Sequence, residues 1–415
     1  MRKLLPLLLA LLVVPMLGAR RRVALPPKGP TFDKEIVRIF QQNCQSCHRP
    51  GDIAPFSLMT YADAAGRAEE IKFMTGTRQM PPWKAAEGCG DFVGVRTMSE
   101  SDIHLIAAWA DAGAPEGDPA DLPPAIAFSN EWSLGAPDLV LSMSKTFTPP
   151  PNRDEYRCFS MPTGAAEDLW VSAIDFRPGD RGTVHHIVPF LDPAGASAKL
   201  DPNGNGYQCF GGALIDNQEV IGAWSPGARA TALPAGTAVR IPKGARVVMQ
   251  VHYHPHFGKV APDRTEIGLY TAKEEVRKRM HYDFLANTQF VLKAGNADQR
   301  VDAIGSFFSD VEIVSLYPHM HLLGKRISVE AILPGGEKVC MIDVPKYEFN
   351  WQGAYIYRSP LALPRGAQLH IESHYDNSAD NFNNPYNPPR DVRWGEASTD
   401  EMCLALVGYT TPDGK

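Results

Sequence analysis

Residues 247–253 have the sequence VVMQVHY, in which every second residue, from Val247 to Tyr253, is apolar. Because successive side chains of a β-strand point to opposite faces, this alternation predicts a strand with one apolar face. Similar short runs follow Ser133, separated by Gly, Pro and Asn turns, and few stretches there have a helical pattern. The pattern favours β-sandwiches, and roughly 280 residues are enough for two of them at typical domain sizes.

The residues before this β-rich part have a helical pattern. Asp33 can cap a helix whose apolar face runs from Ile36 to Phe40. Ser99 begins a capping box for a second helix, and Gly113 provides its end. A Pro- and Asp-rich stretch then reads as a linker, so we predict a small helical unit before the strands.

The length and composition limit the possible functions. At 415 residues the chain is too long for one compact core and fits two or three domains. Its 44% hydrophobic and 21% charged residues are typical of an ordinary globular protein. The formal net charge of −6 provides no basic footprint, so no nucleic-acid partner is expected.

The N-terminus has the pattern of a secretory signal peptide. Arg2 and Lys3 precede an apolar run at residues 4–17, and two small residues follow at 18–19. We therefore expect a periplasmic or secreted protein. The run is short for a membrane span, but the arginines at 20–22 could disfavour cleavage, so a membrane is expected as a partner only if the segment stays uncleaved.

Residues 44–48 have the sequence CQSCH, in which two thiols and an imidazole have the spacing needed to attach a c-type haem. A zinc or structural site is the alternative. The flanking helices and a proline-rigidified Met80 loop favour haem, whereas Met98 lies at a helix start and is expected in the core. The stretch resembles a class I cytochrome c domain. Its expected cofactor-binding residues are Cys44, Cys47, His48 and Met80.

The other cysteines are Cys89, Cys158, Cys209, Cys340 and Cys403. In an exported protein they can form disulfide bonds, but an odd number leaves at least one free or paired between molecules. Spacing does not determine the connectivity. Cys158 with Cys209 is the favoured pair, because both lie in Tyr-x-Cys-Phe segments.

One set of residues has the chemistry of a copper site. His319 and His321 are two residues apart, so on a strand both point to the same face and reach one metal ion. The thioether of Met402 is a soft ligand, which favours cuprous copper over zinc or iron.

A further set contains more histidines. His185 and His186 are adjacent and would diverge on a regular strand, so shared binding of one ion requires a local twist or different ring nitrogens. His252, His254 and His256 lie on one strand face, which gives three candidates where one would suffice.

Four segments resemble, in order, those of the copper type II, ascorbate-dependent monooxygenases, which include peptidylglycine α-hydroxylating and dopamine β-monooxygenases. They are TVHH at 183–186, QVHY at 250–253, HMHLLGK at 319–325 and DEMC at 400–403. The resemblance covers about residues 136–412 and implies two jelly-roll-like sandwiches with one copper each. It implies that His185, His186 and His252 hold the electron-entry copper, and that His319, His321 and Met402 hold the catalytic copper that binds O₂.

Together these expectations give a multidomain fold class: a small all-α cytochrome c domain followed by two all-β jelly-roll-like sandwich domains. The expected parts are a signal peptide at 1–19, the cytochrome c domain at 30–119, a linker at 120–135 and the two sandwiches at 136–271 and 272–415.

The chain departs from the family at the substrate pocket. Peptidylglycine enzymes have an arginine two residues before the His-x-His pair, where this chain has Tyr317, and apolar Leu404 and Leu406 follow the methionine. Loss of a charged anchor argues against a peptide C-terminus as substrate and favours a more apolar pocket.

The resemblance implies an exported dicopper monooxygenase that hydroxylates a C–H bond of a small, rather apolar organic substrate with O₂. We expect its own c-type haem to relay electrons from a periplasmic donor. The alternative is a periplasmic haem and copper protein for electron transfer or redox sensing without hydroxylase activity. A third possibility is a haem domain fused to sandwiches that bind no metal and serve as a binding module.

Overall fold

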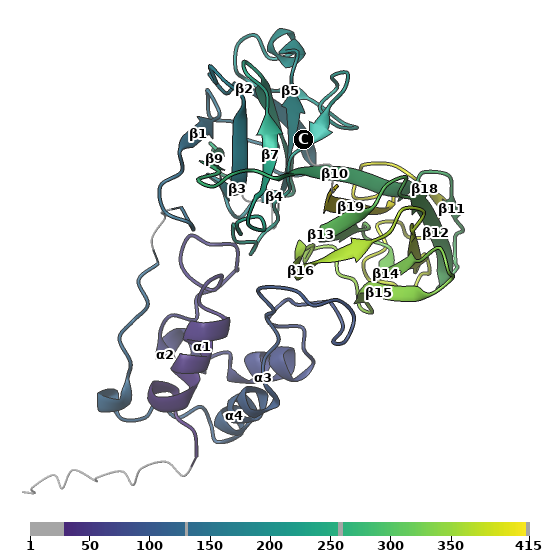
Figure 1. The fold of residues 1–415 in the computed structure, drawn as a ribbon. Helices are drawn as coiled ribbons and strands as arrows, with labels where there is room; N and C mark the ends of the chain where they lie inside the picture. Colours follow the sequence, from purple (N-terminus) through teal and green to yellow (C-terminus); the bar gives the residue numbers. More distant parts are fainter. Residues whose placement is uncertain (1–28, 129–131, 256–259, 412–415) are drawn as a thin grey trace, which may run out of the picture.

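The computed structural model describes residues 29–128, 132–255 and 260–411. The predicted signal peptide at 1–19 lies outside these ranges, and so does His256. Within them, no helix is both long enough and apolar enough to cross a membrane. Figure 1 shows a group of helices, a first β-sandwich above them and a second β-sandwich to its right.

Short helices occupy the N-terminal part. They are η1 (Phe32–Ile36), α1 (Val37–Asn43), α2 (Tyr61–Ala65), α3 (Ala68–Gly76) and α4 (Glu100–Asp111), and two further turns are η2 (Pro119–Asp121) and η3 (Ala196–Lys199). Ser99 caps α4 as predicted, since its hydroxyl accepts a hydrogen bond from the Asp102 amide at 3.0 Å. The cap predicted at Asp33 is wrong, because Asp33 is buried inside the first turn of η1. The rings of Phe40 and Trp109 meet edge to face in the helical core.

The predicted fold class is wrong, because only 12% of the described residues are helical and they form no evident all-α cytochrome c domain. After α3 the chain leaves the helices as a long segment, residues 78–98, with almost no regular structure. Ala85 and Phe92 of this segment belong to the core of the second sandwich, and Phe92 forms an isolated bridge with Tyr357 of that sandwich. Ala85 and Phe92 therefore complete a β-sandwich core, whereas Met98 at the end of the segment belongs to the helical core.

The first β-sandwich contains a five-stranded sheet with the order β5-β2-β8-β4-β6. This sheet packs against strands β1, β9, β3 and β7 of a second sheet, and the apolar side chains of both form one core. The strands are β1 (Leu139–Ser142), β2 (Glu155–Pro162), β3 (Leu169–Arg177), β4 (Val184–Asp192), β5 (Tyr207–Gln208), β6 (Glu219–Val220), β7 (Thr237–Ile241), β8 (Arg246–Tyr253) and β9 (Glu266–Thr271).

The second β-sandwich contains a four-stranded sheet with the order β12-β17-β14-β15. It packs against β10, β19, β13 and β16, and a two-stranded sheet of β11 and β18 lies at its end. The strands are β10 (Lys278–Asn287), β11 (Val291–Leu292), β12 (Gln299–Ser306), β13 (Val311–His319), β14 (Gly324–Ile332), β15 (Lys338–Val344), β16 (Tyr355–Leu363), β17 (Gln368–Tyr375), β18 (Val392–Arg393) and β19 (Cys403–Thr410).

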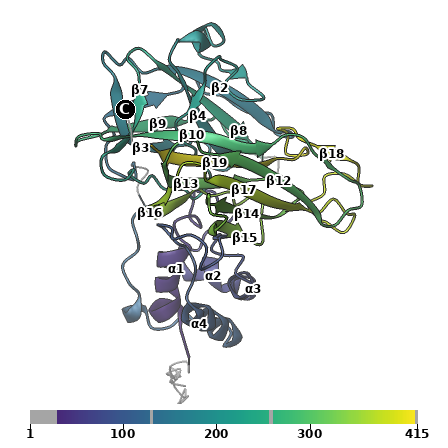
Figure 2. The same ribbon diagram turned by 45° about the vertical axis from the view of Figure 1, so that its right-hand side comes forward.

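One sheet runs through both sandwiches. Its eight strands have the order β1-β9-β3-β7-β10-β19-β13-β16, and β7 pairs with β10 in parallel, with Thr237 opposite Lys278 and Ala238 opposite Arg279. Figures 1 and 2 show β10 reaching from the first sandwich to the second. The two sandwiches are therefore joined by backbone hydrogen bonds as well as by the chain between them.

The stretch VVMQVHY lies in β8 and is buried on both faces. Val251 and the other residues of its apolar face belong to the core of the first sandwich. Val248 on the opposite face belongs to a smaller cluster that includes Leu406 of the second sandwich. The polar residues Gln250 and His252 share this face with Val248, so β8 directs them toward the junction of the two sandwiches.

Two disulfide bonds cross-link the described chain. The predicted pair of Cys158 and Cys209 is confirmed, with Cα atoms 5.7 Å apart. A second bond joins Cys89 of the 78–98 segment to Cys340 of β15, and Cys403 is buried and free. Disulfide bonds persist in oxidising compartments, so this pattern fits an exported protein.

Candidate metal centres and their cavities

A β-bulge in β4 brings the side chains of His185 and His186 close together. The pairing of β4 with β8 shifts register between Val184 and His186, so that His186 lies directly opposite His252. A bulge inserts one extra residue and redirects a side chain, which here is His185. The local twist that adjacent histidines require is therefore present in the strand.

The three histidines converge through their Nδ1 atoms. His185 Nδ1 lies 3.3 Å from His186 Nδ1, and His252 Nδ1 lies 3.4 Å from the same atom. An imidazole nitrogen binds a first-row metal ion at about 2.0 Å, so three such ligands around one ion lie roughly 3.5 Å apart. The spacing of His185, His186 and His252 fits one ion.

Burial favours the neutral form of His186 and His252. Burial lowers the pKa of His186 well below its ordinary value and also lowers the pKa of His252, where a contact with Asp154 acts in the opposite direction. A metal ion binds the neutral ring, so these two histidines have the form that a ligand needs. The ring of Tyr156 stacks on His252 at 4.1 Å between centroids.

Asp154, directly before β2, contacts the far side of this site. Its Oδ2 lies 3.2 Å from His252 Nε2, and its Oδ1 lies 2.6 Å from His254 Nδ1. Burial raises the pKa of Asp154, but the contacts with His252, His254 and Ser398 outweigh it and hold the pKa below its ordinary value.

A second candidate centre lies at the ends of β13 and β19. His319 is the last residue of β13, His321 follows in the turn before β14, and Met402 directly precedes β19. The rings of His319 and His321 lie 5.0 Å apart between centroids and nearly perpendicular. Because β13 ends at His319, a turn and not a continuous strand places His321 beside it.

Both histidines of this centre present Nε2. His319 Nδ1 donates to Gln352 Oε1 at 2.6 Å, and His321 Nδ1 donates to the Asp400 carbonyl at 3.2 Å. A ring whose Nδ1 carries hydrogen has a free lone pair on Nε2. Burial lowers the pKa of His319 to about 4 and that of His321 well below its ordinary value.

Glu401 fixes the backbone around this centre. Its buried carboxyl group accepts hydrogen bonds from the amides of His321 at 2.8 Å, Leu323 at 2.6 Å and Met402 at 3.1 Å. Burial raises the pKa of Glu401 to about 8. The hydroxyl of Tyr375 donates to the Met402 carbonyl at 2.7 Å, so the turn and the methionine are held together.

One cavity of about 380 Å³ opens to both centres. Its lining includes His186 from the first centre and all three candidate residues of the second, His319, His321 and Met402. Tyr317, Leu404 and Leu406, the positions at which the chain departs from the peptidylglycine enzymes, also line this cavity.

A second cavity, of about 480 Å³, lies between the CQSCH segment and the first sandwich. Cys44, Cys47, His48 and Met80 line one side, and His185 and His254 line another. Both thiols are free, and burial raises the pKa of Cys44 to about 12. His48 Nδ1 donates to the Phe56 carbonyl at 3.2 Å, which leaves Nε2 for a ligand. Met98 is buried in the helical core instead.

Three residues that contact the candidate ligands or their backbone were not predicted from the sequence: Asp154, Gln352 and Glu401. Glu401 precedes Met402 within a segment already singled out, and this adjacency was an available signal. Asp154 and Gln352 lie in loops without a pattern and reach their histidines only through the fold.

The C-terminal part of the chain is similar to known proteins. Residues 306–413 match the family described as copper type II ascorbate-dependent monooxygenase, C-terminal domain. Peptidylglycine α-amidating monooxygenase from Rattus norvegicus is 32% identical over 124 residues, and the Xenopus laevis protein A is 29% identical over 126. Each match covers 29% of this chain, but only 12% and 13% of the respective relatives.

Solved structures add no relationship. The major capsid protein P2 of bacteriophage PM2 aligns with 66% of this chain and 96% of its own at 8% identity, with a TM-score of only 0.26. The sequence match, by contrast, includes the segment that carries His319, His321 and Met402. Residues 306–413 are therefore similar to the C-terminal domain of the copper type II ascorbate-dependent monooxygenases, which are oxidoreductases.

Proposed function

We propose that this chain is an exported dicopper monooxygenase, which hydroxylates a C–H bond of a small, largely apolar organic substrate with O₂ and receives electrons through its own c-type haem. The observation that carries the proposal is the shared cavity. Two sets of histidines, one presenting Nδ1 and the other Nε2, belong to different sandwiches, and His186 of the first set lines the same apolar cavity as His319 and His321 of the second.

The donor atoms fit copper. His185, His186 and His252 would hold one ion through three imidazoles, and His319, His321 and Met402 would hold another through two imidazoles and a thioether. Bound copper supplies one-electron redox chemistry, and a thioether favours its cuprous form. Gln352 and Glu401 keep the second set in position, because one orients the His319 ring and the other holds the backbone of His321 and Met402.

The cavity wall favours an apolar substrate. Leu404, Leu406 and Phe284 line it, and none of the described residues that do so is Lys or Arg. A carboxylate would lose its hydration without gaining a cationic partner, which is costly in a buried site. Amidation of peptides, which requires recognition of a C-terminal carboxylate, is therefore disfavoured, as Tyr317 indicates from the sequence.

The second cavity fits a covalently attached haem. Cys44 and Cys47 are free thiols, His48 has Nε2 available, and Met80 lines the same space. Arg96 also lines it and donates to the Gly227 carbonyl at 3.2 Å, and no carboxylate among the described residues forms an ion pair with it. A guanidinium without a carboxylate partner suits the negatively charged propionates of a haem.

The chemistry that a haem supplies when bound is one-electron transfer. His185 lies in the wall of the same cavity, so a candidate copper ligand borders the space that a haem would fill. The external partner that we propose is a periplasmic electron donor. The proposal keeps the haem site without requiring a separate cytochrome c domain.

The first test is the metal content of the purified protein, by elemental analysis together with haem spectroscopy. We expect two coppers and one haem per chain, and one copper in the His319→Ala/Met402→Ala variant. The matched control is His104→Ala, at an exposed position of α4, which should retain both coppers. Haem without copper in a copper-replete preparation would overturn the proposal.

The second test is whether oxygen consumption is coupled to product formation. Oxygen consumption should match formation of a hydroxylated product mole for mole when small apolar compounds are supplied with a reductant. Two bound coppers without such coupling would favour the alternative, an electron-transfer or redox-sensing protein.

A further inference from the structure

Asp154 contacts three residues that belong to different parts of the molecule. His252 and His254 lie on and just after β8, and Ser398 lies in the loop that leads to Met402. The two carboxylate–imidazole distances are 3.2 Å for His252 and 2.6 Å for His254, and the hydroxyl of Ser398 donates to Asp154 Oδ2. The carboxylate of Asp154 therefore contacts the three-histidine site through His252, and also contacts His254 and Ser398.

The two ring nitrogens of His252 face different groups. Its Nδ1 lies 3.4 Å from His186 Nδ1 and faces the other histidines of the site. Its Nε2 is buried, lies 3.2 Å from Asp154 Oδ2 and forms no hydrogen bond with any described residue. In a neutral imidazole one nitrogen carries the hydrogen and the other the lone pair, so a hydrogen on Nε2 leaves Nδ1 available for a metal ion.

Asp154, His252 and His254 also have the spacing of a metal-binding group. A separation of 2.6 Å between Asp154 Oδ1 and His254 Nδ1 is nevertheless that of a short charge-assisted hydrogen bond. Two ligands of one ion at about 2.0 Å each lie roughly 3 Å apart or more. The contact of Asp154 with His254 is therefore read as a hydrogen bond, and the contact with His252 as a charge proximity of 3.2 Å.

We propose that Asp154 is the positioning residue of the three-histidine copper site. It holds His252 in the form that binds through Nδ1, and its negative charge makes the ring a stronger donor. This inference rests on the proposed function, because it assumes that the site binds copper. A stronger donor stabilises the cupric ion more than the cuprous one, so Asp154 lowers the reduction potential of this site.

The other two partners of Asp154, His254 and Ser398, lie in different parts of the molecule. His254 lines the cavity that also holds Cys44 and His48, and its amide donates to the Thr183 carbonyl at 2.8 Å. Ser398 belongs to the loop before Met402. A purely structural role for Asp154 would depend on its contacts with His254 and Ser398, whereas the proposed role depends on its contact with His252.

The test is the Asp154→Asn variant, which keeps the shape of the side chain and removes its charge. We expect cupric ion to bind the three-histidine site about 10- to 100-fold more weakly, the usual loss when such a partner is changed. The electron paramagnetic resonance signal of that copper should change and its reduction potential should rise. The copper at His319, His321 and Met402 should be unaffected, and Asp154→Glu should restore part of the wild-type signal.

Two controls separate the proposed role from a structural one. Asp298→Asn removes a matched carboxylate, 2.9 Å from His374 on the second sandwich, and should leave both coppers unchanged. Ser398→Ala removes one structural tie of Asp154 and should also retain wild-type affinity. If Ser398→Ala weakens copper binding as much as Asp154→Asn does, the positioning role is wrong.

A measurement on the wild-type protein does not depend on any variant folding. Nitrogen-15 NMR of the copper(I) protein reports which nitrogen of His252 carries hydrogen, and Nε2 is expected. Hydrogen on Nδ1, or an Asp154→Asn protein with unchanged affinity and signal, would overturn this inference while leaving a two-copper protein intact. Absence of copper from the wild-type protein would instead overturn the proposed function.

Discussion

The imidazole rings of His186 and His319 lie 6.1 Å apart between centroids, although each belongs to a different sandwich. Both residues line the same cavity of about 380 Å³. The pairing of β7 with β10 and the shared cluster of Val248 and Leu406 hold the two sandwiches together around them. The separation of the two candidate centres is therefore set by backbone pairing and packing.

Gln352→Leu should weaken the second centre selectively. The change removes the acceptor for His319 Nδ1, so the ring loses the contact that keeps Nε2 directed at the metal position. We expect about 10- to 100-fold weaker copper binding there, measured by competitive titration, with the three-histidine site unchanged. Gln41→Leu is the control, since its amide contacts only an exposed carbonyl. Equal losses at both centres would contradict the role of Gln352.

Glu401→Ala should destabilise the fold as well as the second centre. It leaves the buried amides of His321, Leu323 and Met402 without their acceptor. Each unsatisfied buried group costs about 1–3 kcal/mol, so we expect a loss of at least about 3 kcal/mol in the free energy of unfolding. Glu401→Gln keeps one carbonyl oxygen and should lose less. Denaturant unfolding measures the free energy of unfolding of both variants. Equal stability of Glu401→Ala and wild type would show that the hydrogen bonds of Glu401 to the three amides do not stabilise the fold.

The bond between Cys89 and Cys340 should hold the 78–98 segment on the second sandwich. It closes a loop across 251 residues, and a native disulfide typically contributes about 2–5 kcal/mol. The Cys89→Ser/Cys340→Ser variant should be less stable by an amount in this range, and limited proteolysis should cut within residues 78–98. A segment that stays as resistant as in the wild-type protein would show that Phe92 and its neighbours hold it without the disulfide.

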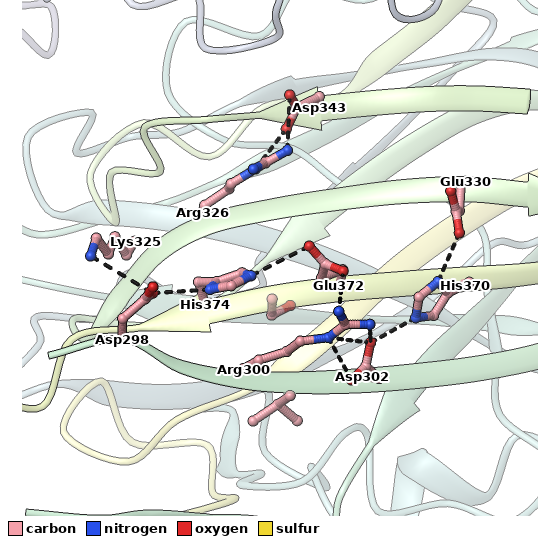
Figure 3. A network of polar contacts seen from close by, with 12 residues as sticks. Asp298, Arg300, Asp302, Lys325, Arg326, Glu330, Asp343, His370, Glu372 and His374 are labelled. Atoms are coloured by element: carbon pink, nitrogen blue, oxygen red, sulfur yellow. Dashed lines mark hydrogen bonds and ion pairs between the residues drawn. The ribbon is translucent and has the colours of Figure 1, made fainter. Parts of the chain in front are cut away.

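A charged network on the four-stranded sheet should give a pH dependence, and Figure 3 shows its members. His370 lies between two carboxylates, 2.7 Å from Asp302 and 3.0 Å from Glu330. Burial lowers the pKa of His370, but the two carboxylates outweigh this and raise it above its ordinary value, while the pKa values of Asp302 and Glu330 are lowered. The protonated ring is therefore favoured in the folded state.

A raised histidine pKa stabilises the fold below the unfolded pKa, about 6.5, and this contribution is lost as pH rises through the folded pKa. The His370→Gln variant lacks this contribution. We expect the stability difference from wild type to be largest on the acidic side of about pH 6.5 and to shrink toward alkaline pH. Unfolding free energies across this range measure it. A difference that is constant with pH would mean that His370 acts by packing alone.

The sequence predicted what depends on local pattern. The alternation in VVMQVHY predicted β8, and Ser99 predicted the start of α4, because strand periodicity and capping are properties of neighbouring residues. It did not predict that β8 is buried on both faces, because its second face meets Leu406, which is far away in the chain.

In the candidate site, too, local spacing could be predicted from the sequence and contacts between distant segments could not. The His-x-His spacing indicated His319 and His321 correctly as neighbours in space, but not the turn that places them. The approach of His185 and His186 depends on a bulge, which is a property of the pairing between two strands. Asp154 reaches His252 from the start of the neighbouring strand β2, so no local pattern marks it.

The parallel pairing of β7 with β10 has a consequence for work with fragments of this chain. A fragment that begins near β10 would lack Thr237 and Ala238, and the edge of β10 that they cover would be exposed. An uncovered strand edge is a template for pairing with other molecules. The second sandwich alone should therefore aggregate or form dimers through β10, even though its sequence match begins only at residue 306.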